Sequence, residues 1–236
     1  MNADNKLLKN GITVVMPALN EEKNIIPSIH LVRKVFEDLD LEYELILIND
    51  GSVDGTKEIC KSFSKKYAQI SFFSHHKPKG MGTCYKEALQ KSTMKYFMLI
   101  VSKNECEENS IKLIVNSRLK ADMVIPYTTN QNGRDFFRRN ISQLFTFVIK
   151  KLTGINLKYF NGTVLHKTNL LKKIDFDANY HTFQSEALIK LIRLNHSYIE
   201  VPTLVNWNKA HKTNAFKIKN IYSVAVFIMK IILKRV

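Results

Sequence analysis

The first half of the chain alternates short apolar runs with helical patterns, and this alternation restricts the fold more than any other feature. The apolar runs cover residues 12–16, 45–48, 70–73, 96–101 and 123–125. Helical patterns separate them at about 21–39, 55–67, 82–92 and 109–119. Near-continuous apolar strands that alternate with helices are typical of a mostly parallel sheet covered on both faces. We therefore expect an α/β fold with a mostly parallel central sheet and helices on both of its faces.

This alternation ends after residue 126. A polar stretch leads into a helix predicted at about 141–153, and a helix near 183–195 precedes a strand at 197–202. The length of 236 residues suits one domain, or one domain with an appendage. We expect a main domain over 1–216 and a basic, apolar C-terminal helix over 217–236.

The net charge of +15 is unevenly distributed along the chain. Residues 1–120 hold 18 Lys and Arg against 15 Asp and Glu, whereas residues 121–236 hold 18 against 6. The second half therefore favours an anionic partner, such as phosphate, nucleic acid or an acidic membrane face. Nucleic acid is the least favoured of these, because no recognition module with interleaved aromatic and basic residues is present.

Cysteine usage and the amino terminus indicate a compartment. The three cysteines, Cys60, Cys84 and Cys106, form an odd set without Cys-x-x-Cys spacing, as expected of reduced structural thiols in a cytosolic protein. The first residues lack the long apolar stretch of a signal peptide. A cytoplasmic location is the prediction.

The segments that follow the strands carry the candidate binding residues, because ligands of open α/β sheets bind outside the carboxyl ends of the strands. After the first strand, Pro17 is expected to stop strand pairing and Asn20 to cap the next helix, leaving Glu21 facing the crevice. After the second strand, Asp50 is expected to contact a nucleobase or ribose, whereas Asp54 is expected to shape a turn.

The segment after the third strand is basic and contains glycine. The sequence "HHKPKGMGTCYKEAL" at 75–89 places these residues where a helix begins, which suits a diphosphate. Its Gly-x-Gly is weak evidence alone, because it is neither a full dinucleotide fingerprint nor a P-loop.

Together these segments resemble a known family. "VVMPALNEEKNI" at 14–25, "ELILINDGSVDGT" at 44–56 and "KGMGTCYKEAL" at 79–89 resemble a family 2 glycosyltransferase with the GT-A fold. The segments at 121–154, 161–171 and 183–221 are similar to the polyprenyl-phosphate (dolichol-phosphate) mannose or glucose synthase branch. The resemblance implies transfer of a sugar, with inversion, from a nucleoside-diphosphate sugar to a lipid-linked phosphate or hydroxyl acceptor.

The resemblance also implies roles for individual residues. The base and ribose of the donor would be held by Pro17, Asn20, Glu21 and Asp50, and its phosphates would lie near Lys79 and Gly80. Residues that would meet the diphosphate, an acceptor phosphate or the sugar are Arg134, Arg138, Arg139, Gln184, Glu186, Lys209 and Lys212. Glu186 is the candidate general base for a hydroxyl acceptor, while a phosphate acceptor needs none.

One motif of the family is missing. In the family the fourth strand ends in Asp-x-Asp, whose carboxylates hold Mg²⁺ or Mn²⁺, but this chain has Ser102-Lys103-Asn104. The Lys103 ammonium is one replacement for the ion. Glu105 and Glu107, with Asn104, are fallback metal ligands if the chain stays extended there. In a third interpretation catalysis is lost and only binding of nucleotide sugar or membrane remains. No cofactor is certain, and the triplet disfavours the metal.

Two further segments depart from the family pattern. Lys158 stands where the family often has Asp, and Asn161-Gly162-Thr163 stands where it has a Ser-Gly-Phe-like triplet. These changes leave donor binding possible but put the usual acceptor geometry in doubt.

The C-terminal segment bears on membrane partners. Residues 221–233 are strongly apolar but include Lys230, and a membrane-spanning helix needs roughly 20 apolar residues. Two alternatives are a buried closing helix and a helix on the membrane surface, with Lys217, Lys219, Lys230, Lys234 and Arg235 toward headgroups. We expect peripheral association with the anionic, cytoplasmic face of a membrane. Oligomeric state cannot be predicted from these patterns.

Overall fold

The computed structural model describes residues 9–133, 135–177, 182–207 and 218–233. The strands are β1 (Lys9–Ala18), β2 (Tyr43–Asp50), β3 (Ile70–His75), β4 (Met94–Leu99), β5 (Met123–Thr128), β6 (Leu165–Lys167) and β7 (Tyr198–Thr203). The α-helices are α1 (Glu22–Asp38), α2 (Thr56–Lys66), α3 (Met81–Lys91), α4 (Glu108–Asn116), α5 (Phe136–Thr153), α6 (Thr168–Lys173), α7 (Phe183–Arg193) and α8 (Ile218–Ile232). A 3-10 turn, η1, covers Gln131–Gly133.

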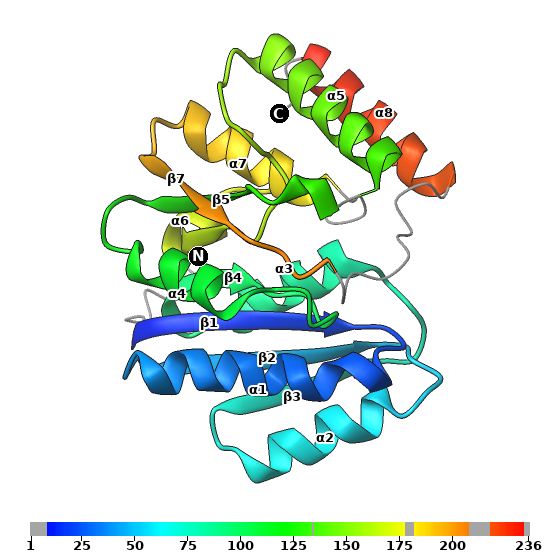
Figure 1. Ribbon diagram of the computed structural model, residues 1–236, viewed down its shortest axis with the longest axis vertical. Helices are drawn as coiled ribbons and strands as arrows, with labels where there is room; N and C mark the ends of the chain where they lie inside the picture. The colour runs from blue at the N-terminus through cyan, green and yellow to red at the C-terminus, as the bar shows by residue number, and fades with distance from the viewer. Residues whose placement is uncertain (1–8, 134, 178–181, 208–217, 234–236) are drawn as a thin grey trace, which may run out of the picture.

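The described strands form one sheet in the order β3-β2-β1-β4-β6-β5-β7. Neighbouring strands pair in parallel except at β6, which is antiparallel to both β4 and β5. The predicted mostly parallel sheet is confirmed (Figure 1). Because β6 alone is reversed, the loops after the other six strands leave the sheet at the same edge.

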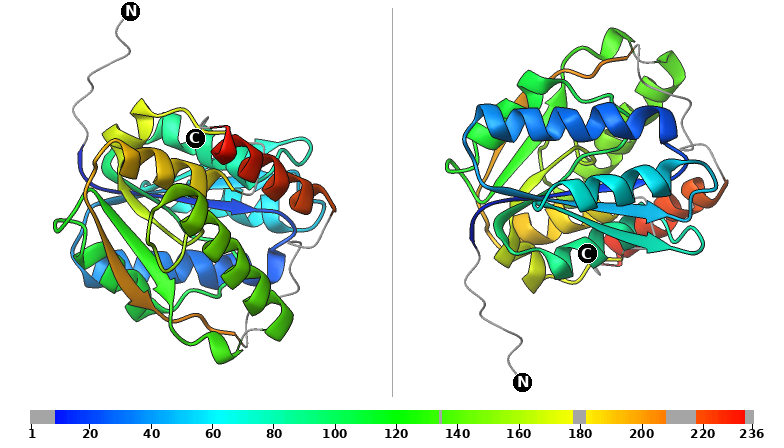
Figure 2. Two further views of the ribbon diagram at one scale, coloured as in Figure 1. Left: turned by 90° about the horizontal axis from the view of Figure 1, so that it is seen from above. Right: turned by 90° about the horizontal axis from the view of Figure 1, so that it is seen from below.

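Helices cover both faces of this sheet (Figure 2), as the alternating side chains of β1 show. Val14 and Met16 pack in a core with α1, α2 and α4. Val15 points the other way, into a second core with α3, α5, α6, α7 and α8. Successive strand residues face opposite sides, so a strand buried on both sides reads as a continuous apolar run.

The structure differs from the sequence prediction at the end of β1, at the start of α5 and in two short elements. The strand β1 continues past Pro17 to Ala18, which pairs with Asn49. The helix α5 begins earlier than residue 141, because Asp135 accepts a hydrogen bond from the Arg138 amide and caps the helix there. The short β6 and α6 were not predicted, since a three-residue strand is too brief to show a periodic pattern.

The C-terminal helix α8 packs on α5 and on the core through its inner face. Phe227 and Ile231 are buried in the core that includes α7. The Phe227 ring also stacks on Phe145 of α5, with centroids 6.4 Å apart, and α5 and α8 lie side by side at one end of the molecule (Figure 1). None of the described helices is long and apolar enough to cross a membrane.

Candidate functional site

The loops after β1 and β2 are tied together at the carboxyl edge of the sheet. Asn20 has a left-handed backbone with φ of 56°, and its Oδ1 accepts a hydrogen bond from the Val53 amide at 2.9 Å. Its own amide donates to Ser52 Oγ at 3.0 Å. Asn20 therefore does not cap α1 as expected, because its side chain is used across the crevice instead.

The start of α1 is capped from the other loop. The Glu22 amide donates to Asp54 Oδ2 at 3.2 Å, and the Glu21 amide donates to the Thr56 hydroxyl at 2.8 Å. Asp54 also accepts the Thr56 amide at 3.1 Å, so its predicted role in shaping the turn is confirmed. The Glu21 carboxylate accepts a hydrogen bond from the side-chain amide of Asn24 at 2.9 Å. The loop after β2 thus supplies the acceptors for the orphan amides at the start of α1.

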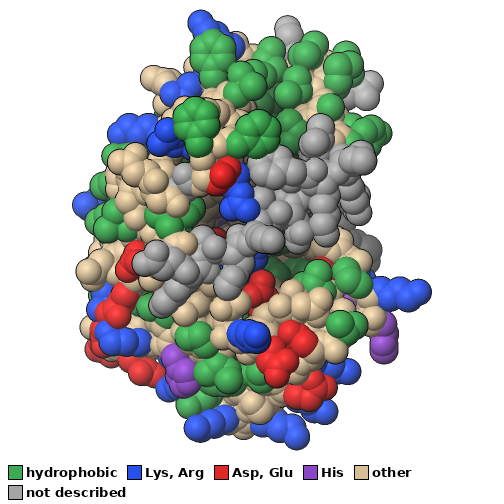
Figure 3. All heavy atoms as spheres, turned by 45° about the vertical axis from the view of Figure 1, so that its right-hand side comes forward, with side chains coloured by type: hydrophobic (Ala, Val, Ile, Leu, Met, Phe, Trp, Pro, Cys, Tyr) green, Lys and Arg blue, Asp and Glu red, His purple; other side chains and the backbone are tan. Residues whose placement is uncertain are grey.

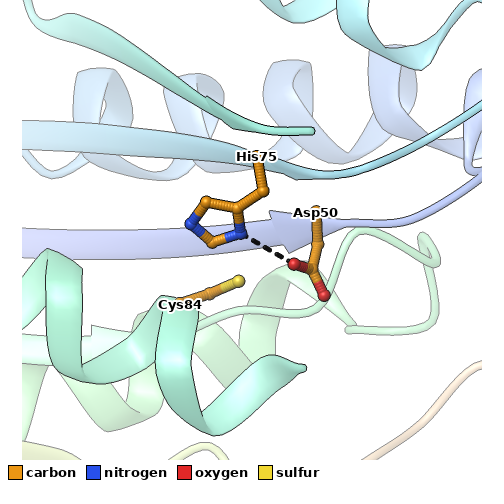
Figure 4. A group of neighbouring side chains, drawn as sticks. All are labelled: Asp50, His75 and Cys84. Carbon is orange, nitrogen blue, oxygen red and sulfur yellow. Dashed lines mark hydrogen bonds and ion pairs between the residues drawn. The ribbon is translucent and has the colours of Figure 1, made fainter. Parts of the chain in front are cut away.

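Asp50, at the end of β2, holds the turn that precedes α3. Its Oδ1 accepts the Lys79 amide at 2.8 Å and its Oδ2 accepts the Gly80 amide at 2.8 Å. Strand register places His75 directly opposite, where its Nδ1 lies 2.8 Å from Asp50 Oδ1 (Figure 4). Burial raises the pKa of Asp50, but these hydrogen bonds outweigh it and leave the pKa below its ordinary value.

These contacts change how the Asp50 prediction is understood. Both carboxylate oxygens are engaged within the protein, and the residue is only 4% exposed. The observed arrangement fixes the turn before α3, and contact with a base or ribose remains a prediction.

The amino terminus of α3 is suited to an anion. Gly80 has φ of 97°, a conformation that favours glycine, and the first turn of α3 carries no acidic residue. The first amides of a helix lack intrahelical partners and attract negative charge. Lys79 stands beside this turn with its Nζ 3.1 Å from Glu87 Oε1. These features are the physical basis for a phosphate at this turn, which remains a prediction.

The triplet after β4 is built without carboxylates. Ser102 is buried and its hydroxyl donates to the Pro17 carbonyl at 2.8 Å. Asn104 has φ of 54°, and its amide donates to Ser28 Oγ at 2.9 Å. Lys103 lies between them, partly exposed, with no hydrogen bond or ion pair to any residue that the structure describes. The Lys103 ammonium thus lies at the carboxyl edge without a partner among the described residues.

These residues do not fit Mg²⁺ or Mn²⁺, which prefer several oxygen ligands. The Ser102 hydroxyl is committed to Pro17, and Lys103 is cationic. Glu105 and Glu107 flank Cys106, which forms an antiparallel β-bridge with Val205. The chain is therefore extended there, as a ligand role for both carboxylates would require. Within the described ranges, however, neither belongs to a group of three side chains from His, Cys, Asp and Glu that is close enough for a metal.

The chain after β7 closes over this region, which sequence reasoning missed. The Asn206 amide donates to the Glu105 carbonyl at 2.9 Å, and Trp207 Nε1 donates to the Asn130 carbonyl at 2.6 Å. A Cβ at Gly133 would clash with the Trp207 side chain, so only glycine fits there. The single tryptophan of the chain was the available signal for this contact.

The predicted sugar-pocket residues lie at the start of α7. The Phe183 ring packs against Tyr85 of α3 with centroids 4.9 Å apart, which places this helix end beside α3. Gln184 is buried and its Oε1 has no hydrogen-bond partner among the described residues. Glu186 is also buried, with its Oε1 2.7 Å from Lys190 Nζ and its Oε2 accepting the Asp177 amide.

The remaining predicted residues are arginines and lysines of the second half. Arg138 lies in the first turn of α5, partly exposed, beside Arg139. Arg134, Lys209 and Lys212 lie outside the described residues.

Comparison with known proteins gives a consistent result. The model of glycosyl transferase family 2 matches residues 13–179. A dolichyl-phosphate beta-glucosyltransferase of Trichomonas vaginalis is 31% identical over 93 residues, which cover 37% of this chain and 28% of that protein. A dodecaprenyl-phosphate galacturonate synthase of Rhizobium johnstonii is 18% identical over 176 residues, covering 73% of this chain and 52% of that protein. The chain thus spans about half, or less, of the length of these curated relatives.

Among solved structures, glucosyl-3-phosphoglycerate synthase of Mycobacterium tuberculosis in complex with Mn²⁺, UDP and phosphoglyceric acid has a similar fold. The TM-score is 0.70 at 20% identity, and the match covers 96% of this chain and 78% of that one. At this identity the likeness supports the fold alone.

Proposed function

This chain belongs to glycosyl transferase family 2, and on that basis we propose that it transfers a sugar from a nucleoside diphosphate to a lipid-linked acceptor. The observation that carries the proposal is the interlocked carboxyl edge. The side chains of Asn20, Asp54 and Asp50 accept hydrogen bonds from the amides of Val53, Glu22 and Gly80, respectively. These bonds join the end of β1, the end of β2 and the turn before α3 into one frame. A frame of this kind orients a donor before reaction.

The lipid-linked acceptor is proposed from two supports. The relatives in Trichomonas vaginalis and Rhizobium johnstonii are named for dolichyl-phosphate and dodecaprenyl-phosphate. Glu186, the general base predicted from the sequence, is paired with Lys190 at 2.7 Å. An anionic phosphate acceptor needs no general base, so this pairing favours phosphate over hydroxyl.

The transfer needs stabilisation of its leaving group. An acceptor oxygen bonds to the anomeric carbon while the bond from that carbon to the donor diphosphate breaks, and the diphosphate departs with the electron pair. The free amides of α3 and the Lys103 ammonium are the groups that stabilise its charge. No step is assigned to a divalent ion, because the Ser102-Lys103-Asn104 triplet does not suit one.

The partner surface is proposed to be an anionic membrane at its cytoplasmic face. The outer faces of α5 and α8 together expose large apolar side chains, namely Phe136, Phe137, Ile141, Leu144, Phe147, Leu152, Tyr222, Met229, Ile232 and Leu233. Figure 3 shows hydrophobic side chains gathered at this end of the molecule, with Lys and Arg beside them. Apolar helix faces flanked by basic residues are typical of peripheral membrane binding.

A second candidate function is binding of nucleotide sugar without turnover, which the missing Asp-x-Asp favours. One experiment separates the two. The protein is incubated with UDP-, GDP- and dTDP-sugars and a polyprenyl phosphate in vesicles, and the lipid product is followed by mass spectrometry. Ligand-observed NMR on the same donors reports binding. Formation of a lipid-linked sugar establishes transfer, and donor binding without product establishes the second function. Absence of both product and donor binding would reject both functions.

A further inference from the structure

Three side chains of different chemical type converge behind the turn that precedes α3. Asp50 comes from the end of β2, His75 from the end of β3 and Cys84 from α3 (Figure 4). One ligand atom from each lies within 4.8 Å of the others, and no other such group occurs among the residues that the structure describes. We propose that Asp50, His75 and Cys84 bind a divalent cation of the zinc class.

The donor set determines the class of ion. A carboxylate oxygen, an imidazole nitrogen and a thiolate sulfur are the ligands that Zn²⁺ takes in a tetrahedral arrangement. Mg²⁺ and Mn²⁺ prefer oxygen, so this site is chemically distinct from an Asp-x-Asp site. Three protein ligands leave the fourth tetrahedral position to water.

The groups around the ligands are already placed to support an ion. Metal-binding histidines usually donate their second ring N–H to a carboxylate. His75 Nε2 lies 2.8 Å from Glu87 Oε2, on the side of the ring away from Asp50. With its proton on Nε2, the ring presents the Nδ1 lone pair toward Asp50 and the ion. The Lys79 and Gly80 amides hold the two oxygens of Asp50 in a fixed orientation.

The charges also balance when the ion is bound. Binding releases the thiol proton of Cys84 and any proton on His75 Nδ1 to solvent. The two negative charges of Asp50 and the Cys84 thiolate then neutralise the +2 ion. Glu87 is paired separately with the ammonium of Lys79 at 3.1 Å. The buried cluster is thus left without net charge, which the cost of burying charge favours.

The competing interpretation is that His75 is a protonated ring that donates to both Asp50 and Glu87 and that no metal enters. Co²⁺ distinguishes the two, because its bond to thiolate produces a near-ultraviolet charge-transfer band and tetrahedral ligation produces visible bands. The full chain is treated with chelator, exchanged into buffer and titrated with Co²⁺ and then Zn²⁺. We expect a single Co²⁺ per chain with both signatures, and displacement by Zn²⁺. No charge-transfer band would overturn the proposal.

Matched variants assign the signal to the site. Cys84→Ala should abolish the charge-transfer band, while Cys60→Ala, which alters another fully buried cysteine, should retain it. Glu87→Gln should lower the affinity roughly 10–100-fold without removing the band. A band that persists in Cys84→Ala would reject the assignment.

X-ray absorption on the zinc-loaded wild-type chain keeps the test independent of how the variants fold. It should show a single sulfur ligand with nitrogen and oxygen ligands. A shell of nitrogen and oxygen alone would overturn the proposal. None of these readouts depends on sugar transfer, so the result stands apart from the proposed function.

Discussion

Ser102 donates its hydroxyl hydrogen to the carbonyl oxygen of Pro17 at 2.8 Å, which joins the end of β4 to the end of β1. The side chain at the first position of the triplet is therefore turned inward and buried. Within the triplet, Lys103 is the residue that carries a charge. At the first position, where the family has a carboxylate, this chain thus has a buried hydroxyl directed at the backbone of β1.

We predict that nucleotide binding does not require a divalent ion. EDTA should leave the affinity for UDP or GDP nearly unchanged, since the triplet lacks suitable oxygen ligands. Isothermal titration calorimetry with and without EDTA measures this. Loss of binding in EDTA that Mg²⁺ or Mn²⁺ restores, and Zn²⁺ does not, would contradict the prediction and restore Glu105 and Glu107 as ligands.

Lys103→Ala should weaken UDP or GDP binding about tenfold, or about 1.4 kcal/mol, which is comparable to one hydrogen bond to a charged group. The affinity for the nucleoside should change less, because the nucleoside has no phosphate for the ammonium to contact. Lys95→Ala is the control, since Lys95 is exposed near the start of β4, at the opposite edge of the sheet. An equal loss for nucleotide and nucleoside would exclude a phosphate contact.

Asp50→Asn should lower both the free energy of unfolding and the nucleotide affinity. An amide in place of the carboxylate leaves one of the two buried N–H groups of Lys79 and Gly80 without its acceptor, which costs roughly 1–3 kcal/mol. The turn before α3 then loosens, and nucleotide binding should weaken at least tenfold. Urea denaturation and calorimetry measure the two effects. Asp175→Asn is the control, because Asp175 is exposed. Wild-type affinity in a folded Asp50→Asn protein would remove the turn from the donor site.

The alternating pattern of the first half predicted the sheet and its helices because strands buried on both faces leave a continuous apolar run. The position of Asp50 at a strand end was predicted for the same reason. Its pairing with His75 was not, because that depends on strand register, and the contact of His75 with Glu87 depends on how α3 packs. The contact of Trp207 with Gly133 joins residues far apart in sequence and leaves no local pattern.

Asp122 should make the fold sensitive to acid. Its Oδ1 lies 2.7 Å from Lys167 Nζ, and its Oδ2 accepts the Ser197 amide and hydroxyl, which connects β5, β6 and β7. The Lys167 contact and the Ser197 hydrogen bonds, against an opposing effect of burial, lower the pKa of Asp122 from 3.8 to about 2. A lowered pKa stabilises the fold above the ordinary value, and this stabilisation is lost as the pH falls through about 4 to about 2.

Asp122→Asn should therefore lower the free energy of unfolding by about 1–2 kcal/mol near neutral pH. This is less than the whole pKa shift would give, because the Asp122–Lys167 pair is partly exposed to solvent. The difference from wild type should shrink as the pH falls toward 2, as measured by urea denaturation at a series of pH values. A difference that stays constant with pH would show that the carboxylate charge does not act in this way.

The outer faces of α5 and α8 provide the last prediction. Phe136, Leu144 and Phe147 are 68%, 61% and 57% exposed and lie on one side of α5, whose other side packs against Phe227. Moving such apolar surface from water into the membrane interface lowers the free energy by roughly 25 cal/mol per Å² buried. Replacing all three by Ser should therefore reduce flotation with anionic vesicles severalfold while leaving the thermal transition nearly unchanged, because these side chains contribute little to the core.

Wild-type binding should also fall as salt rises, since the attraction of the basic second half to anionic headgroups is screened. Equal recovery of wild type with neutral and anionic vesicles would contradict the electrostatic attraction, and full binding by the triple variant would exclude these three side chains from the membrane contact.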